Sequence, residues 1–148
     1  MRPPIFPPNR AGNDAQQFMH RARMFRDAAV KLVAYTNAEQ NWPRYALLLH
    51  AIELALKAFV KQREMQGAQF SKLPSNHDLK AWYDLAVQSG LNDSPRITQN
   101  ISLLTDLHFS HFARYPQDHP TPVPDLSLIA DEAAEYLIDT ITQIVNPR

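Results

Sequence analysis

The sequence predicts an all-α fold, an antiparallel up-and-down bundle of four to five helices. Apolar residues recur at steps of three and four along several stretches, and no stretch alternates apolar and polar residues long enough to indicate a strand. Prolines cluster near the N-terminus and between Pro116 and Pro124, which leaves long windows for helices between them. Because the connections between these windows are short, an antiparallel bundle is favoured.

Length and composition restrict the class of protein. The 148 residues suit one domain with its own core, and 15 basic and 15 acidic side chains give zero net charge. This balance argues against a strongly basic, non-specific nucleic-acid binder. The chain has no cysteine, so it has no disulfide and no thiolate metal ligand, which fits the cytoplasm. We expect neither a signal peptide nor a membrane span.

The chain divides into two parts. Residues 1–13 are expected to form an extended Pro-rich segment, because Pro3, Pro4, Pro7 and Pro8 forbid a helix there. Residues 14–148 are expected to form a single helical domain. Its first helix follows a cap at Asn13 or Asp14 and runs to about Thr36. The apolar face of this helix consists of Phe18, Ala22, Phe25, Ala29, Leu32 and Val33.

The remaining surface of the first helix is basic. Arg21, Arg23, Arg26 and Lys31 are expected to face solvent, and contact with phosphates is the alternative.

A long apolar helix is expected from Trp42 to Gln66, with Pro43 in its first turn and Gly67 as its stop. It is apolar nearly all round, so it belongs in the middle of the domain. The exceptions are His50, Glu53 and Lys57, whose spacings of three and four place them on one face. This polar stripe is the first candidate for a functional site.

Three further helices complete the bundle. One follows Ser75–Asp78, which is close to a capping box, and ends at Gly90. The next starts at a cap before Pro95 and runs to about Phe112. The last is capped by Asp125 or Ser127. The inward residues expected are Leu79, Trp82, Leu85, Ala86 and Val87, then Ile97, Ile101, Leu104 and Leu107, and finally Ile129, Ala133, Tyr136, Leu137, Ile141, Ile144 and Val145.

The polar stripe allows two chemical interpretations. Glu53 and Lys57 have the spacing and order of a helix ion pair, which is either structural or part of a site that perturbs the pKa of the carboxyl. In the second interpretation His50 and Glu53 face His108 and His111 across the bundle and bind a metal in a metal-dependent hydrolase. The site we favour contains no metal and no cofactor.

A second candidate site lies near the end of the fourth helix. Four residues separate Arg114 from His119. An arginine can hold a phosphate through two hydrogen bonds, and a histidine can move the proton in phosphodiester cleavage. Pro116 and Pro120 place these two side chains on an extended loop. The structural alternative is that Arg114 bonds the last helix carbonyls and Tyr115 buries its ring.

Three short motifs resemble the HEPN domain family in order and spacing. The segment Tyr45–Ala58 resembles the alanine-rich second helix of that family, and Asn76–Leu79 resembles the "HDL" at the start of its third helix. His111–Pro116 resembles its "RYP" element after the fourth helix. The resemblance covers roughly residues 15–145.

The resemblance implies a helical bundle, commonly a homodimer, of bacterial or archaeal origin and linked to nucleotides or RNA. It implies a possible nucleotidyltransferase partner in a toxin–antitoxin or defence context. The binding residues would be Glu53, Lys57, His77, Arg114 and Tyr115. The alternatives are a metal-independent ribonuclease, in which Arg114 holds the phosphate and His119 moves the proton, and a purely structural interaction module. The Tyr-Pro pair after Arg114 departs from the nuclease pattern.

Overall fold

The computed structural model describes residues 13–32, 42–109 and 126–146. These ranges contain five helices and no strand: α1 Asp14–Lys31, α2 Trp42–Met65, α3 Leu79–Gln88, α4 Pro95–Phe109 and α5 Leu126–Val145. The predicted all-α helical bundle is confirmed.

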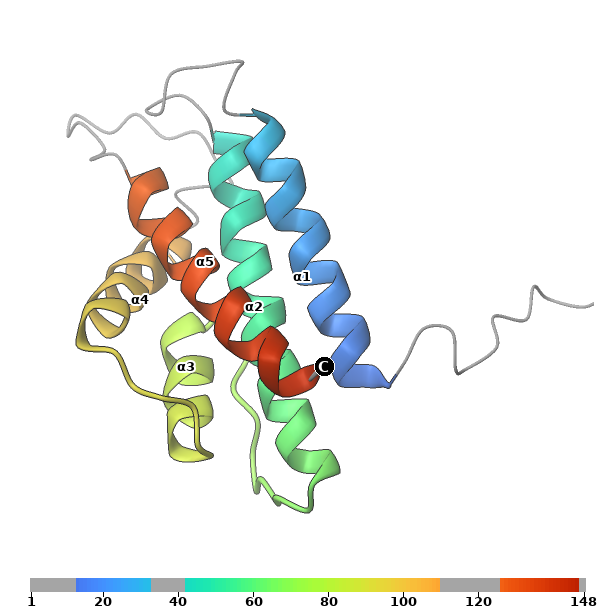
Figure 1. Ribbon diagram of the computed structural model, residues 1–148. Helices are drawn as coiled ribbons and strands as arrows, with labels where there is room; N and C mark the ends of the chain where they lie inside the picture. Colours follow the sequence, from blue (N-terminus) through green and yellow to red (C-terminus); the bar gives the residue numbers. More distant parts are fainter. Residues whose placement is uncertain (1–12, 33–41, 110–125, 147–148) are drawn as a thin grey trace, which may run out of the picture.

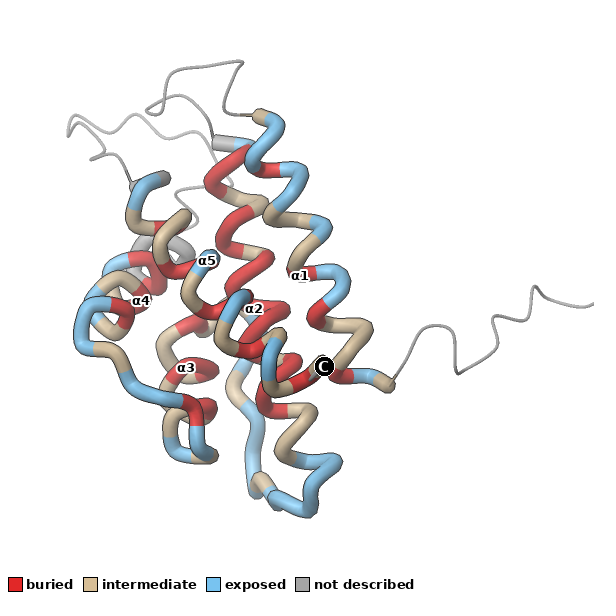
Figure 2. The backbone as a smooth tube through the Cα atoms, in the orientation of Figure 1, coloured by how far each residue is buried: buried red, intermediate tan, exposed pale blue. Residues whose placement is uncertain are grey.

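The helix α2 is the central element. Figure 1 shows α1 and α5 running alongside α2, with α3 and α4 packed at one side. The helix contacts α1, α3 and α5, while α4 contacts α3 and α5. Figure 2 shows that buried residues continue along most of α2, whereas the other helices bury one face. Its largest fully buried side chains are Leu48, Leu49, Ile52, Leu56 and Phe59. The apolar composition of this helix is therefore explained by neighbours on several sides.

Local capping chemistry sets two helix starts. The Asn13 side chain accepts from the Gln16 N–H at 2.8 Å, and the Gln16 side chain accepts from the Asn13 N–H at 3.1 Å. Asp78 caps α3 by accepting from the Ala81 N–H at 3.1 Å. The cap that the sequence offered at Ser75 is wrong, because α3 begins at Leu79 and Asp78 is its N-cap. The Ser75 carbonyl accepts from the indole N–H of Trp82 at 3.1 Å.

Two glycines end helices as predicted. Gly67 follows α2 with φ 103° and Gly90 follows α3 with φ 118°, in the left-handed region that L side chains rarely adopt. Ser127 lies inside α5 and therefore does not cap it. The helices α1 and α4 end at Lys31 and Phe109. Residues 33–36 and 110–112, also predicted helical, lie outside the described residues, as do the Pro-rich segments and Asp125.

Most residues predicted to face inward are buried, but several are only partly buried: Phe18, Phe25, Leu85, Val87, Ile129, Tyr136 and Ile144. Phe18 and Phe25 pack against the core and remain only partly buried, whereas Ala15 and Met19 are fully buried. Tyr83 is buried although we did not predict it. Its hydroxyl lies 3.1 Å from the Asp93 carboxylate and accepts from the Ser94 N–H at 3.2 Å, so burial leaves it bonded.

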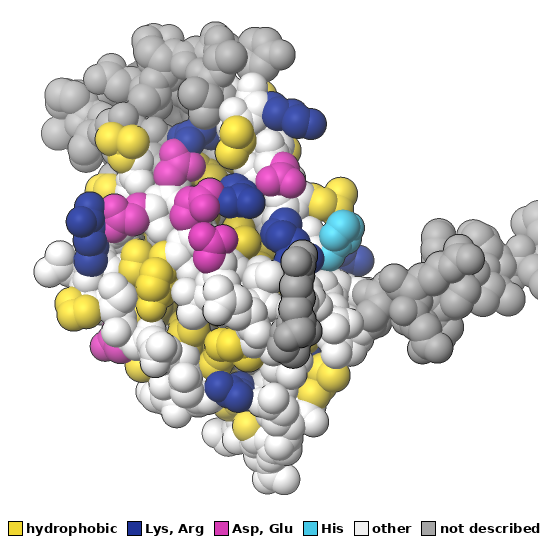
Figure 3. Space-filling model, viewed as in Figure 1, with side chains coloured by type: hydrophobic (Ala, Val, Ile, Leu, Met, Phe, Trp, Pro, Cys, Tyr) yellow, Lys and Arg dark blue, Asp and Glu magenta, His cyan; other side chains and the backbone are white. Residues whose placement is uncertain are grey.

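Acidic side chains of α5 pair with arginines from three other helices. Figure 3 shows acidic and basic side chains gathered on the α5 face. The pairs are Arg26–Glu135, Arg44–Asp131 and Arg96–Glu132. Part of the basic surface of α1 is therefore not solvated as predicted, since Arg26 faces α5. None of the helices in the described ranges combines the length and apolarity needed to cross a membrane.

Candidate functional site

The central helix buries one carboxylate, that of Glu53. The residue is 3% exposed and lies midway along α2, between turns whose neighbours are apolar. A buried carboxylate is costly unless it is paired and hydrogen-bonded. Its partners therefore identify the polar groups that the fold brings to this point.

The segment before α3 supplies two bonds to a single oxygen of Glu53. The backbone N–H of His77 donates to Oε1 at 2.7 Å, and Nδ1 of the His77 ring lies 2.9 Å from the same oxygen. His77 has φ 73°, a left-handed conformation that is strained for a non-glycine residue. The two bonds to Glu53 offset this strain and hold the ring at the end of the loop.

Lys57 binds the other oxygen of the carboxylate. Its Nζ donates to Glu53 Oε2 at 3.1 Å and to the side-chain oxygen of Asn76 at 2.8 Å. The ammonium also lies 5.4 Å from the centre of the Trp82 ring, within the range of a cation–π contact. An ammonium carries three N–H donors. Two of them are used by Glu53 and Asn76, so one donor is left for a ligand.

We call Glu53, Lys57, Asn76 and His77 the Glu53 cluster. Burial alone raises the pKa of the Glu53 carboxyl, but the charge and hydrogen bond of Lys57 and the bonds from His77 outweigh burial, so the pKa is lowered overall. The carboxylate is therefore ionised at neutral pH. It acts as an anchor that orients cationic and donor groups, and it does not suit the role of a general acid.

The bond to Glu53 fixes the tautomer of the His77 ring. Because the carboxylate can only accept, Nδ1 carries the proton in the neutral ring and Nε2 is the basic nitrogen. The His77 side chain is 42% exposed, and Asn76 is also exposed. The cluster thus brings an imidazole, an amide and an ammonium to one edge of the bundle, and the amide and the ammonium suit the oxygens of a phosphate.

The comparisons with known proteins give no relative. No family model, no curated protein and no solved structure matches the chain. The structural support for a functional proposal therefore comes from the geometry of the Glu53 cluster.

The predicted site residues fall into two groups. Glu53, Lys57 and His77 are brought together. Arg114, Tyr115 and His119 lie outside the described residues. That they belong to the same site as Glu53, Lys57 and His77 therefore stays a prediction.

The predicted metal ligands are not assembled among the described side chains. Both oxygens of Glu53 are bonded to Lys57 and His77, while the His50 ring makes an edge contact with Phe25 at 4.4 Å between centroids. Within the described part of the chain no three histidine or acidic residues are grouped to hold a metal ion. The side chain of His108 and all of His111 fall outside it.

Sequence reasoning missed two members of the site. Asn76 lies directly before the recognised His77–Asp78 pair, and its amide bonds the ammonium of Lys57. Trp82 was predicted as a core residue only, yet its ring also faces that ammonium. The proximity of Asn76 to His77 was the available signal, because a residue next to a site loop often points into the site.

Proposed function

We propose that this chain is a HEPN-like helical bundle that binds a nucleotide or RNA through the edge formed by the Glu53 cluster. The observation that supports the proposal most directly is the arrangement of Lys57 and His77 around one buried carboxylate. Such a carboxylate fixes two nitrogen-bearing side chains in place before any ligand arrives, which reduces the entropy lost on binding.

The chemistry of the cluster favours a phosphate ligand. The remaining ammonium donor and the Asn76 amide can each donate to a phosphate oxygen, while Nε2 of the neutral His77 ring can accept from a hydroxyl of the ligand. Zero net charge favours recognition at a local site over non-specific attraction to nucleic acid. Arg114 and Tyr115 belong to the proposed site on the strength of the sequence motif alone.

The proposal extends to the assembly. The motifs that resemble HEPN domains support a cytoplasmic homodimer with a nucleotidyltransferase partner in a toxin–antitoxin or defence setting. Sedimentation of the purified chain tests the dimer, and co-expression with a candidate nucleotidyltransferase tests the partner.

The experiment that tests ligand binding measures affinity for a mixed pool of short single-stranded RNAs and for AMP, with wild type and His77→Asn. Asparagine tolerates the left-handed backbone of position 77, so the variant removes the ring and preserves the fold. We expect at least a threefold loss of affinity. His20→Asn on the exposed side of α1 is the matched control and should bind like wild type.

A second variant tests the ammonium. Lys57→Gln removes one cation, so the slope of log affinity against log salt for RNA should fall by about 0.7 if Lys57 contacts a phosphate. Circular dichroism reports whether the variant is folded. Equal affinities and equal salt slopes for wild type and both variants would exclude the Glu53 cluster as the binding site. RNA cleavage that resists chelator in the same samples would instead favour the ribonuclease alternative.

A further inference from the structure

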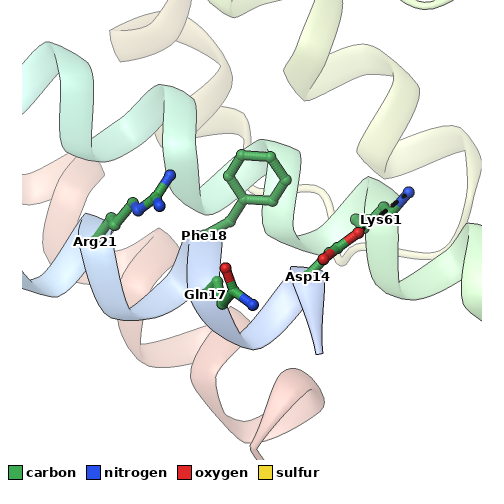
Figure 4. A pocket seen from close by; sticks show the side chains of 5 residues that line it. All are labelled: Asp14, Gln17, Phe18, Arg21 and Lys61. Carbon is green, nitrogen blue, oxygen red and sulfur yellow. Dashed lines mark ion pairs between the residues drawn. The ribbon is translucent and has the colours of Figure 1, made fainter. Parts of the chain in front are cut away.

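A second polar site lies between the start of α1 and the last turns of α2. It is an open pocket of about 190 Å³ lined by Asp14, Gln17, Phe18, Arg21 and Lys61. Figure 4 shows the Phe18 ring between the Arg21 guanidinium on one side and the Lys61–Asp14 pair on the other. Two cationic side chains thus flank an aromatic surface, in a region that the Glu53 cluster does not include.

The two cations are available to a ligand. Arg21 makes no hydrogen bond or ion pair with another described residue. Among the described residues, the ion-pair partner of Lys61 is Asp14, at 3.9 Å, and the Asp14 side chain is 67% exposed. An exposed pair at this distance contributes little to stability, so an anion can replace Asp14 as the partner of Lys61.

The size of the pocket restricts the ligand. Complete small-molecule sites usually occupy roughly 300–1,000 Å³, so about 190 Å³ suits one end of a ligand. Two cations at the rim fit a phosphate, because arginine can bind it through two hydrogen bonds and lysine acts as a point charge. The partly buried Phe18 ring offers an aromatic surface to a nucleobase.

We propose that this pocket binds a phosphate monoester that carries a nucleobase, with Arg21 and Lys61 on the phosphate and Phe18 against the base. The ligand is a nucleoside monophosphate or the 5′-phosphorylated end of an RNA. The proposal rests on the proposed function only for the class of ligand, since its residues belong to a different site.

The test is a titration of isotope-labelled protein with AMP, adenosine and inorganic phosphate, followed by NMR. We expect AMP to bind at least tenfold more tightly than either fragment and to shift the amide signals of Gln17, Arg21 and Lys61. Arg21→Gln should weaken AMP binding about tenfold, because it removes a charge-assisted bond. Lys31→Gln on the same helix makes the same change of charge outside the pocket and should leave the affinity within twofold.

A third variant is expected to change the affinity for AMP in the opposite direction. Asp14→Asn removes the negative charge from the pocket and should strengthen AMP binding about threefold. A purely structural role for these residues would not produce opposite effects from Arg21→Gln and Asp14→Asn. Equal affinity for AMP and adenosine, or equal effects of Arg21→Gln and Lys31→Gln, would overturn the proposal. Inorganic phosphate binding as tightly as AMP would overturn the role of Phe18.

Two trinucleotides identify the source of the phosphate. If a 5′-phosphorylated trinucleotide binds more tightly than AMP, the ligand is the end of an RNA, and if the two bind equally, the ligand is the mononucleotide. Both results support the proposed pocket. A 5′-hydroxyl trinucleotide that binds as tightly as the 5′-phosphorylated one would contradict it. The variants also separate the two proposals. His77→Asn and Lys57→Gln test the Glu53 cluster, so their failure leaves an effect of Arg21→Gln intact.

Discussion

At the scale of single residues, the carboxylate of Glu53 shows how a charge is retained inside an apolar helix. Each oxygen has its own partner: the His77 N–H and ring nitrogen bond Oε1, and the Lys57 ammonium bonds Oε2. Removing one member of such a set leaves another group desolvated and poorly bonded. The bonds of Glu53 with Lys57 and His77 are therefore expected to contribute more to the free energy of unfolding than ion pairs on the surface do.

This arrangement makes a pH-dependent prediction for Glu53→Gln. The amide keeps the shape and can still accept from the His77 N–H, but it loses the charge that faces Lys57. At pH 7 we expect a loss of about 2 kcal/mol in the free energy of unfolding. Because the pKa of Glu53 is lowered in the folded state from its usual 4.5, its contribution is fully present above that value. It is lost as the pH falls through the lowered folded-state pKa.

The measurement is urea denaturation of wild type and Glu53→Gln from pH 7 to pH 3. The difference between the two should narrow below about pH 4.5. Glu64→Gln on the exposed end of α2 is the control and should stay within about 0.5 kcal/mol of wild type. A difference that is constant across the whole range would contradict the assigned ionisation of Glu53.

At the scale of elements, α5 is held by arginines from α1, α2 and α4. These pairs differ in burial: Arg44 is 7% exposed, whereas the Arg96 side chain is 77% exposed. Coulomb attraction in the buried pair is less screened by water, and the guanidinium of Arg44 cannot easily regain solvent if its partner is neutralised. The bond between Arg44 and Asp131 should thus dominate the electrostatic attachment of α5.

We expect Asp131→Asn to lower the free energy of unfolding by about 1–2 kcal/mol, with little dependence on salt. Arg96→Gln, which removes the exposed pair with Glu132, should cost no more than about 0.5 kcal/mol. Thermal or urea denaturation in 0.05 and 0.5 M sodium chloride provides the measurement. If Arg96→Gln lowered the free energy of unfolding more than Asp131→Asn, burial would not explain the difference in strength between the two ion pairs.

The helices also show which features the sequence could predict and which it could not. The cap at Asn13 and the glycine stops depend on bonds within a few residues, so local patterns predicted them, although the cap of α3 lies at Asp78 and not at Ser75. The Arg44–Asp131 pair joins residues 87 positions apart and depends on how α2 and α5 are rotated in the packed bundle. No local pattern contains that rotation, and for the same reason the contacts of Arg23 and Arg26 with α5 were not predicted, whereas Arg21 and Lys31 are exposed as expected.

The same distinction between local patterns and helix packing applies to the candidate sites. Glu53 and Lys57 are one helical turn apart, so their pairing was predictable from spacing. His77 entered through a motif, whereas Asn76 was missed because only the path of the loop brings its amide to Lys57. Contact of Arg21 with a phosphate was an alternative that the sequence offered, but the pocket was not foreseen, because Lys61 comes from another helix and its position relative to α1 depends on packing.

At the scale of the whole molecule, α2 connects α1, α3 and α5 through one continuous core. Truncating a side chain at its centre should therefore weaken all the described helices together. Leu56 is fully buried, so Leu56→Ala removes apolar contacts and leaves a cavity, at an expected cost of about 2–5 kcal/mol. Leu128→Ala, at an exposed position of α5, should cost no more than about 0.5 kcal/mol.

The shared core also predicts the form of the unfolding transition. Far-ultraviolet circular dichroism reports all helices, while tryptophan fluorescence reports in part on Trp82 beside the Glu53 cluster. Both signals should change at the same urea concentration in wild type, and both should move together to lower urea in Leu56→Ala. If fluorescence changed before circular dichroism, α3 and the Glu53 cluster would unfold apart from the rest. A ligand that binds the cluster would then stabilise that part selectively, whereas a single cooperative core spreads its effect over the entire bundle.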